Sequence, residues 1–308
     1  MIKRKLYSEL IDHLPQKEMS LIIGARQAGK TTLMEMVKAY LDNGGERTLF
    51  LNLDIEWDRP HFDSQAALLK KIELELGQQR GYVFIDEIQR KDDAGLFLKG
   101  LFDLNLPYKF ILSGSGSLEL KQRINESLVG RKRLFELSTV TFEEFVHHRT
   151  DYRYEKNLAD FLAIEKDRVQ SLLAEYMQFG GYPRIVITSE QAEKLRLIDE
   201  IYRSVLEKDI AYLLKLDKPD VFSTLIKVLA SQVGQLLNYS ELASTLNVSF
   251  PTVKKYLWYA QKIFLVEVIA PYARNVRKEI SKSPVPYFCD LGLRSYALGR
   301  FGHQPVKM

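Results

Sequence analysis

Hydrophobic residues in the first 140 positions follow two alternating patterns. Short, nearly continuous apolar runs are typical of parallel strands covered on both faces, and they alternate with segments whose apolar residues recur at helical spacing. The runs predict strands at Leu21–Gly24, Thr48–Leu53, Tyr82–Asp86, Phe110–Ser113 and Leu134–Leu137. The periodic segments predict helices at Lys30–Leu41, Gln65–Leu76 and Ala94–Leu104. This order predicts an α/β fold in which helices wrap both faces of a parallel sheet.

After residue 142 the strand pattern disappears, and apolar residues recur at helical spacing as far as about residue 216. Gly180-Gly181-Tyr182-Pro183 interrupts this helical stretch with a stop and a turn. Asp217-Lys218-Pro219-Asp220 marks a boundary, beyond which further helices precede two β-rich pieces, Phe264–Ile269 and Val285–Phe288. We therefore expect three parts, at residues 1–150, 151–216 and 217–308.

Composition excludes several classes of protein. With 46% hydrophobic and 27% charged residues over 308 positions, the chain is globular in composition, neither disordered nor fibrous. The one cysteine, Cys289, excludes an internal disulfide, and no Cys/His cluster offers a zinc site. Charged residues interrupt every apolar stretch short of a membrane span, and the basic N-terminus lacks the apolar region of a secretory signal. We expect a cytoplasmic protein with no membrane partner.

The formal net charge of +4 is small, but it is unevenly distributed. Residues 216–308 contain twelve Lys and Arg against six Asp and Glu, whereas the preceding residues carry a slight negative excess. A near-neutral first part followed by a basic one suggests two tasks, the second of which involves a polyanion.

A phosphate-binding motif follows the first predicted strand. Residues 24–31 fit the pattern G-x-x-x-x-G-K-[ST] between a strand and a helix, as this chemistry requires. Glycines allow backbone N–H groups to point inward and form an anion site at the helix N-terminus. Lys30 would reach the β- and γ-phosphates, and the Thr31 hydroxyl would bind Mg²⁺. The expected nucleotide-binding residues are Gly24, Ala25, Arg26, Gln27, Ala28, Gly29, Lys30, Thr31 and Thr32.

Two adjacent carboxylates, Asp86 and Glu87, end the third predicted strand. Because ligands bind at the carboxyl edge of a parallel sheet, both would lie beside the phosphate-binding loop. Asp86 would hold Mg²⁺ through water, and Glu87 would orient and deprotonate the attacking water. The alternative is a solvated Asp-Glu pair that caps the next helix.

Two further residues are candidates for the same reaction. Ser113 ends the fourth predicted strand and could hold the lytic water, although a serine-rich turn explains the same residues. Arg131 stands just before the fifth strand and could act in trans as an arginine finger on a neighbouring subunit's γ-phosphate. The alternative for Arg131 is an ordinary surface cation.

Residues 239–257 read as a helix-turn-helix. Ser240 could cap the first helix, and Pro251 suits the start of the second. Lys254 and Lys255 would face outward on that second helix. Arg277 and Lys278 lie in a basic stretch between the two β-rich pieces and complete a candidate winged helix that would bind duplex DNA. The alternative is a packing or protein-contact module, because the basic excess is modest.

The chain resembles a family of prokaryotic AAA+-like ATP-binding proteins. The resemblance rests on GARQAGKTTLM, FIDEIQ, LSGSGSLEL, the string from GRKR to TFEEF, and GGYP. It implies ATP as the nucleotide, an AAA+-like core at 1–150, a helical lid at 151–216 and a winged helix at 217–308. It also implies that Pro183 packs near the adenine; the alternative for Gly181-Tyr182-Pro183 is a helix-terminating turn. Family members commonly continue into a restriction-nuclease-like domain, whereas this chain stops at Met308 without a PD…(D/E)xK set. It is a naturally short member, the product of a split gene or a truncated chain, and nuclease activity cannot be claimed for it.

Together these features predict a Mg²⁺-dependent ATPase whose nucleotide state switches a C-terminal winged helix. Two alternatives stay open. One is a nucleotide-gated regulator with slow hydrolysis, and the other is a defence- or toxin-related protein whose winged helix binds a protein partner. Arg131 in trans would imply a homo-oligomer.

Overall fold

The computed structural model describes residues 1–115, 127–206, 219–272 and 283–303. The chain divides into two compact units. The first is Lys3–Leu137, and the second combines Met1–Ile2 with Ser138–Met308. The predicted division at residues 150 and 216 stays a prediction.

A five-stranded parallel sheet forms the centre of the unit Lys3–Leu137, with strand order β2-β3-β4-β1-β5. The strands are β1 (Met19–Gly24), β2 (Thr48–Asn52), β3 (Gly81–Asp86), β4 (Tyr108–Ser115) and β5 (Lys132–Leu137). All five predicted strands are therefore confirmed. Most begin one or two residues earlier than predicted, because the residues at their amino ends, several of them polar, also pair with neighbouring strands.

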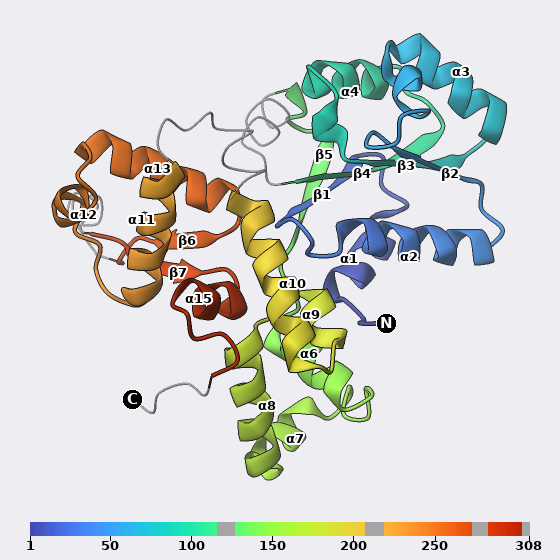
Figure 1. Cartoon of the computed structure of the whole chain (residues 1–308). Helices are drawn as coiled ribbons and strands as arrows, with labels where there is room; N and C mark the ends of the chain where they lie inside the picture. Colours follow the sequence, from blue (N-terminus) through green and yellow to red (C-terminus); the bar gives the residue numbers. More distant parts are fainter. Residues whose placement is uncertain (116–126, 207–218, 273–282, 304–308) are drawn as a thin grey trace. The chain divides into compact units, whose positions relative to one another are not determined.

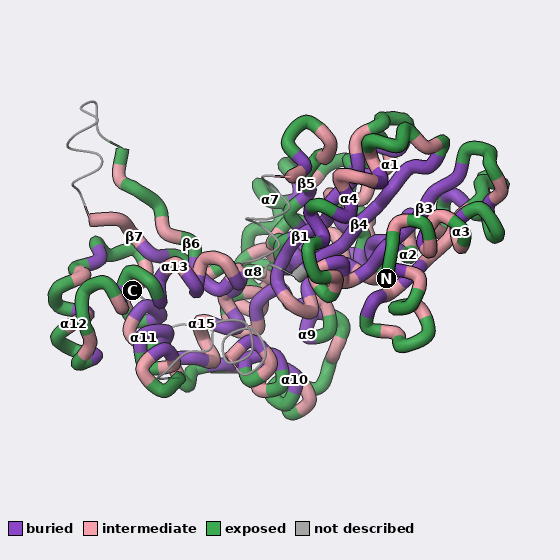
Figure 2. Tube along the Cα trace, turned by 90° about the horizontal axis from the view of Figure 1, so that it is seen from above, coloured by how far each residue is buried: buried purple, intermediate pink, exposed green. Residues whose placement is uncertain are grey.

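Helices cover both faces of this sheet, as the sequence predicts. Figure 1 shows α1 and α2 on one face and α3 and α4 on the other. The helices are α1 (Lys5–His13), α2 (Lys30–Asn43), α3 (Gln65–Leu76) and α4 (Ala94–Asp103), with the short turns η1 (Arg59–Phe62) and η2 (Ile88–Arg90). Alternate strand residues such as Ile22, Phe84 and Phe135 pack against Leu33 and Val37 of α2. The central strands β1 and β3 are buried along their whole length (Figure 2), which explains their unbroken apolar runs.

The second unit is mainly helical. Its helices are α6 (Phe142–Arg149), α7 (Leu158–Ile164), α8 (Lys166–Phe179), α9 (Pro183–Ile187), α10 (Gln191–Ser204), α11 (Pro219–Ser231), α12 (Tyr239–Leu246), α13 (Phe250–Lys262) and α15 (Leu291–Ala297). An antiparallel pair, β6 (Val266–Ile269) and β7 (Val285–Phe288), accompanies them. Within the described parts of the chain, no helix is long and apolar enough to cross a membrane.

The predicted helix-turn-helix corresponds to α12 and α13. Asn238, rather than Ser240, caps α12, because its side chain accepts hydrogen bonds from the backbone N–H groups of Ser240 and Glu241. Ser249 caps α13, and Val253 lies on its buried face. The assignment of α12, α13, β6 and β7 to a winged helix stays a prediction.

The turn at Gly180-Gly181 packs against the start of α15. A Cβ atom on Gly180 would lie 2.4 Å from the Gly292 nitrogen, and one on Gly181 would lie 2.1 Å from the Val140 oxygen. Gly180 also has a φ of +74°, which favours glycine. These two glycines are therefore required by close backbone packing within this unit.

Candidate functional site

The phosphate-binding loop joins the end of β1 to the start of α2. Gly29 has a φ of +96°, which a residue with a Cβ rarely adopts, and Gln27 also lies in the left-handed region, at +60°. The first turn of α2 contains no acidic residue, so its N-terminus keeps its attraction for an anion. The loop therefore has the local geometry that the motif predicts.

Gly24 serves packing as well as the loop. A Cβ atom at this position would lie 2.1 Å from the backbone oxygen of Leu137 on the neighbouring strand β5. The close approach of β1 and β5 thus requires glycine at position 24.

Lys30, the first residue of α2, is buried beneath the loop, with 6% of its surface exposed. Its ammonium donates hydrogen bonds to the backbone oxygens of Gly24 at 3.1 Å and Ala25 at 2.9 Å. The charge is therefore held inside the curve of the loop, where bound phosphates are expected.

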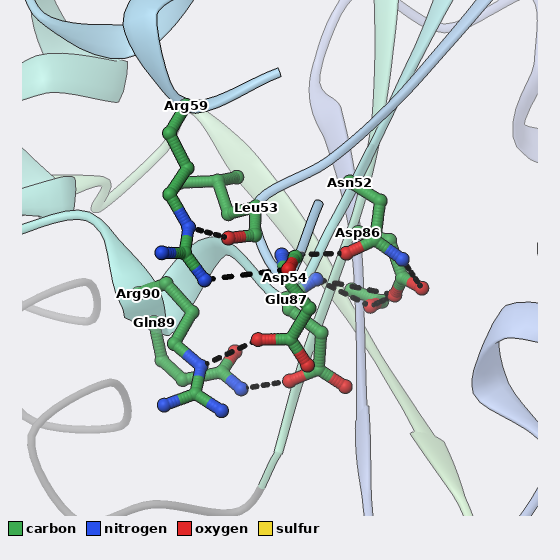
Figure 3. Close-up of polar contacts among 9 residues, drawn as sticks. Asn52, Leu53, Asp54, Arg59, Asp86, Glu87, Gln89 and Arg90 are labelled. Atoms are coloured by element: carbon green, nitrogen blue, oxygen red, sulfur yellow. Dashed lines mark hydrogen bonds and ion pairs between the residues drawn. The ribbon is translucent and has the colours of Figure 1, made fainter. Parts of the chain in front are cut away.

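Asp86 is the centre of the polar network at the carboxyl edge of the sheet. The Thr31 hydroxyl donates a 2.7 Å hydrogen bond to Asp86 Oδ2, and the Ser113 hydroxyl donates to Asp86 Oδ1. Asn52 Nδ2 donates to Oδ2 at 3.3 Å (Figure 3). Side chains from three other elements, α2, β2 and β4, thus converge on the one carboxylate that ends β3.

The sequence predicted three of these four residues and missed Asn52. The signal was present, because Asn52 is the last residue of β2 and therefore lies at the same sheet edge as Asp86, its register partner. Ser113 is fully buried, and its oxygen also accepts a hydrogen bond from the Glu87 N–H at 3.3 Å. Its expected role in holding the lytic water stays a prediction.

The donor set suits Mg²⁺. Thr31 and Asp86 present a hydroxyl and a carboxylate oxygen within 2.7 Å of each other, and hard oxygen ligands of this kind are those that Mg²⁺ prefers. Among the described residues there is no cluster of three His, Cys, Asp or Glu side chains that could hold a metal. A site with one carboxylate and one hydroxyl fits a Mg²⁺ ion that takes its other ligands from water and phosphate.

Glu87 follows β3 with a left-handed backbone, at φ +57° and ψ 40°. Such a conformation is strained for a residue with a Cβ and is often found at functional sites. Burial raises the pKa of the Glu87 carboxyl above its ordinary value, while the Lys30 ammonium opposes that rise and Asp86 adds to it. A carboxyl with a raised pKa is better suited to accept a proton than an ordinary glutamate.

Side chains of the turn η2 and of the loop after β2 contact each other next to Glu87 (Figure 3). Gln89 donates a hydrogen bond from its amide to the Glu87 carboxylate. Arg90 forms an ion pair with Asp54, whose atoms approach to 2.7 Å, and Arg59 donates to the Leu53 backbone oxygen at 2.9 Å. These contacts hold the surroundings of Glu87 in a defined position.

Arg131 lies at the opposite edge of the sheet. It immediately precedes β5, and its backbone oxygen accepts a hydrogen bond from Met19, the first residue of β1. Its guanidinium donates to Asp103 of α4 at 2.8 Å and 3.4 Å. Within one chain Arg131 is therefore remote from the loop, so that a role as arginine finger in trans stays a prediction.

The remaining candidates lie in the second unit. Pro183 is the first residue of α9 and is partly buried; its proximity to adenine stays a prediction. Lys254 and Lys255 are exposed on α13, as expected, and the Lys254 ammonium lies 4.8 Å from the centre of the Phe250 ring. Arg277 and Lys278 lie outside the described residues. All four DNA contacts stay predictions.

Two family models match separate parts of the chain. Residues 16–146 match a model described as an AAA domain, and residues 170–304 match one described as a domain of unknown function, DUF8612. The first match covers the five strands and all the residues that surround Asp86. The predicted resemblance to AAA-type P-loop proteins is thereby confirmed for the first unit.

Several curated relatives cover most of the chain. An uncharacterized protein of Haemophilus influenzae is 26% identical over 98% of this chain and 75% of its own length. The uncharacterized protein Rv2008c of Mycobacterium tuberculosis is 29% identical over 91% of this chain and 56% of its own length. The aliphatic sulfonates import ATP-binding protein SsuB of Rhodopseudomonas palustris is 26% identical over 61% of this chain and 62% of its own. The chain thus spans between about half and three quarters of these relatives.

Two solved structures align with most of the chain at low similarity. The Aeropyrum pernix ORC1 protein in complex with DNA has a TM-score of 0.35 and 11% identity, over 95% of this chain and 91% of that one. The replication initiator DnaA bound to AMPPCP and single-stranded DNA has a TM-score of 0.37 and 14% identity, over 85% and 90% of the two chains. At these scores the likeness supports no functional conclusion.

Proposed function

We propose, on the premise that residues 16–146 form an AAA-type P-loop domain, that this chain binds and hydrolyses ATP with Mg²⁺. The observation that carries the proposal is the 2.7 Å hydrogen bond from Thr31 of the loop to Asp86 of β3. It joins the two motifs that hydrolases of this class need at one point on the sheet edge.

The loop would bind the phosphates of ATP through its backbone and through two of its side chains. Backbone N–H groups of residues 25–31 and the N-terminus of α2 would receive the phosphate oxygens. Lys30 would exchange its hydrogen bonds to Gly24 and Ala25 for phosphate oxygens, which compensate its charge better than carbonyls do. Thr31 and Asp86 would hold Mg²⁺, which supplies neutralisation of phosphate charge when bound.

Glu87 is the proposed general base. It would accept a proton from the water that attacks the γ-phosphorus, while Lys30 stabilises the negative charge that moves to the phosphate oxygens. Ser113 and Asn52 keep Asp86 in place through their hydrogen bonds, which leaves Glu87 as the carboxylate that can turn towards water.

The second unit is proposed to bind DNA in a way that depends on the bound nucleotide. Lys254 and Lys255 on α13, with Arg277 and Lys278, would contact the phosphates of duplex DNA. ATP would change the affinity for DNA, and DNA would change the affinity for ATP by the same factor. An oligomer in which Arg131 reaches a neighbouring subunit would complete the ATPase site.

One experiment tests the core of this proposal. ATP affinity and multiple-turnover hydrolysis are measured with and without Mg²⁺ for the parent protein, for Lys30→Ala and for Lys38→Ala, a matched control at a half-buried lysine farther along α2 that pairs with Asp42. We expect Mg²⁺-dependent hydrolysis by the parent and the control, and loss of most ATP affinity in Lys30→Ala. Near-normal affinity in a folded Lys30→Ala protein would remove the P-loop assignment.

A further inference from the structure

The side chain of Gln89 is placed against the proposed general base. Gln89 lies on η2, two residues after Glu87, and its Nε2 donates a hydrogen bond to Glu87 Oε2 (Figure 3). The left-handed backbone of Glu87 turns the chain from the end of β3 into η2. The contact therefore depends on the strained residue itself.

The other end of the Gln89 amide has no partner among the residues that the structure describes. Its carbonyl oxygen, Oε1, is buried and accepts no hydrogen bond from any of them. The orientation of the amide is fixed by chemistry, because an ionised carboxylate only accepts hydrogen bonds and must therefore face the NH₂ group. The carbonyl is thus the end of the amide that faces away from Glu87. A buried acceptor that receives no hydrogen bond destabilises the structure.

A bound water molecule would supply the hydrogen-bond donor that the Gln89 carbonyl lacks. Water has two O–H donors, and the Glu87 carboxylate and the Gln89 carbonyl offer one acceptor each. When both donors are engaged, a lone pair of the water oxygen is left to attack phosphorus. One acceptor alone would allow the water to rotate, whereas two acceptors fix its orientation.

We infer that Gln89 is a water-positioning residue of the ATPase site, whose Oε1 accepts the second hydrogen bond of the lytic water that Glu87 deprotonates. The inference rests on the proposed role of Glu87. In the reaction the O–H bond directed to Glu87 breaks, its proton moves to the carboxylate, and the oxygen forms a bond to the γ-phosphorus while the bond to the leaving ADP oxygen breaks. Gln89 keeps its own protons throughout.

The test separates orientation of water from binding of nucleotide. Gln89→Leu and Gln89→Met retain the approximate size of the side chain and lose its carbonyl. We expect kcat to fall by about 10- to 100-fold in both variants, while the Kd for a non-hydrolysable ATP analogue with Mg²⁺ changes less than twofold. Gln79→Leu, in an exposed position of the same unit, is the matched control and should keep the parental kcat.

A double variant adds a result that a merely structural role would not produce. If both residues act on one water, Gln89→Leu should slow the Glu87→Gln protein little further, because the shared function is already lost. Independent, multiplied losses would overturn the inference, and so would parental turnover in Gln89→Leu. Equal losses of kcat and analogue affinity would also overturn it, because they would assign Gln89 to nucleotide binding. Absence of hydrolysis by the parent protein would instead overturn the proposed function.

Discussion

The carboxylate of Asp290 accepts a 2.8 Å hydrogen bond from the backbone N–H of Gly181, a residue 109 positions earlier in the chain. The same carboxylate caps α15, because its other oxygen accepts a hydrogen bond from the Leu293 N–H at 3.0 Å. One buried side chain therefore links the turn before α9 to the last described helix of the second unit.

Replacing Asp290 with alanine should destabilise this unit by about 2 kcal/mol, because two buried N–H groups lose their acceptor and α15 loses its cap. Chemical denaturation would measure the change in the free energy of unfolding. Glu267→Ala, on the exposed side of β6, is the control and should change stability little. An unchanged midpoint for Asp290→Ala would show that this contact is energetically neutral.

The adjacent carboxylates should give different defects. Glu87→Gln keeps the shape of the side chain and removes the base, so ATP should bind and persist while turnover falls by about 100-fold or more. Asp86→Asn should instead weaken the Mg²⁺ dependence of ATP binding. Parallel titrations of nucleotide and Mg²⁺, together with single-turnover rates, distinguish the two. Parental hydrolysis by Glu87→Gln would require another residue to activate the water.

The position of Arg131 predicts complementation between defective subunits. Mixing Arg131→Ala with Lys30→Ala protein should restore part of the turnover, since each provides what the other lacks. Activity per subunit should also rise with protein concentration in the parent. Asp103→Ala is an informative control, because it releases Arg131 from its ion pair and should preserve activity. Turnover that is independent of concentration, without complementation, would identify Arg131 as a surface cation.

Binding of DNA by α13 should depend on salt. Each phosphate contact contributes about −0.9 to the slope of log affinity against log salt, so Lys254→Ala with Lys255→Ala should reduce the slope by about two. Removing Arg277 and Lys278 should reduce it by the same amount and weaken all sequences alike. Lys166→Ala with Lys227→Ala removes the same charge elsewhere in this unit and should have a smaller effect. No duplex binding at moderate salt would favour a protein partner.

His13 should make the first unit sensitive to acid. Burial, together with the positive charges of Lys109 and Arg133, lowers its pKa to about 4, although Glu18 opposes this shift. Because the unfolded chain binds this proton near pH 6.5, stability should fall as the pH decreases from about 6.5 to about 4. The slope for one group is at most about 1.4 kcal/mol per pH unit. Denaturation at several pH values should show a smaller slope in His13→Asn, and an unchanged one in His303→Asn, which alters an exposed residue of the second unit.

The sequence predicted the first unit well for a physical reason. Its central strands are buried on both faces, so their apolar runs are unambiguous. Strand β3 ends at Asp86 both in the prediction and in the structure. Asn52 and Gln89 were not assigned a role, although Asn52 lies near the end of a predicted strand and Gln89 ends the FIDEIQ motif. Their contacts with Asp86 and Glu87 depend on strand register and on a left-handed turn, which the folded backbone reveals.

The helical second unit was less predictable in detail. Helix spacing located α12 and α13, but the cap of α12 lies at Asn238 because two consecutive N–H groups converge on its side chain. Asp290 could not have been identified as a buried acceptor either. Its partner Gly181 is too distant in the chain for any local pattern to relate them.

The central position of β1 in the sheet has a consequence for synthesis on the ribosome. This strand lies between β4 and β5, whose residues are translated roughly 85 to 115 positions after it. Until β4 has left the exit tunnel, an apolar strand that carries the nucleotide loop has neither of its two neighbours, and it lacks β5 until residue 137 has emerged. Pairing over such separations is slow, and exposed strand edges invite aggregation. The emerging chain should therefore depend on chaperones during this interval, and nucleotide can stabilise it only after β5 is complete.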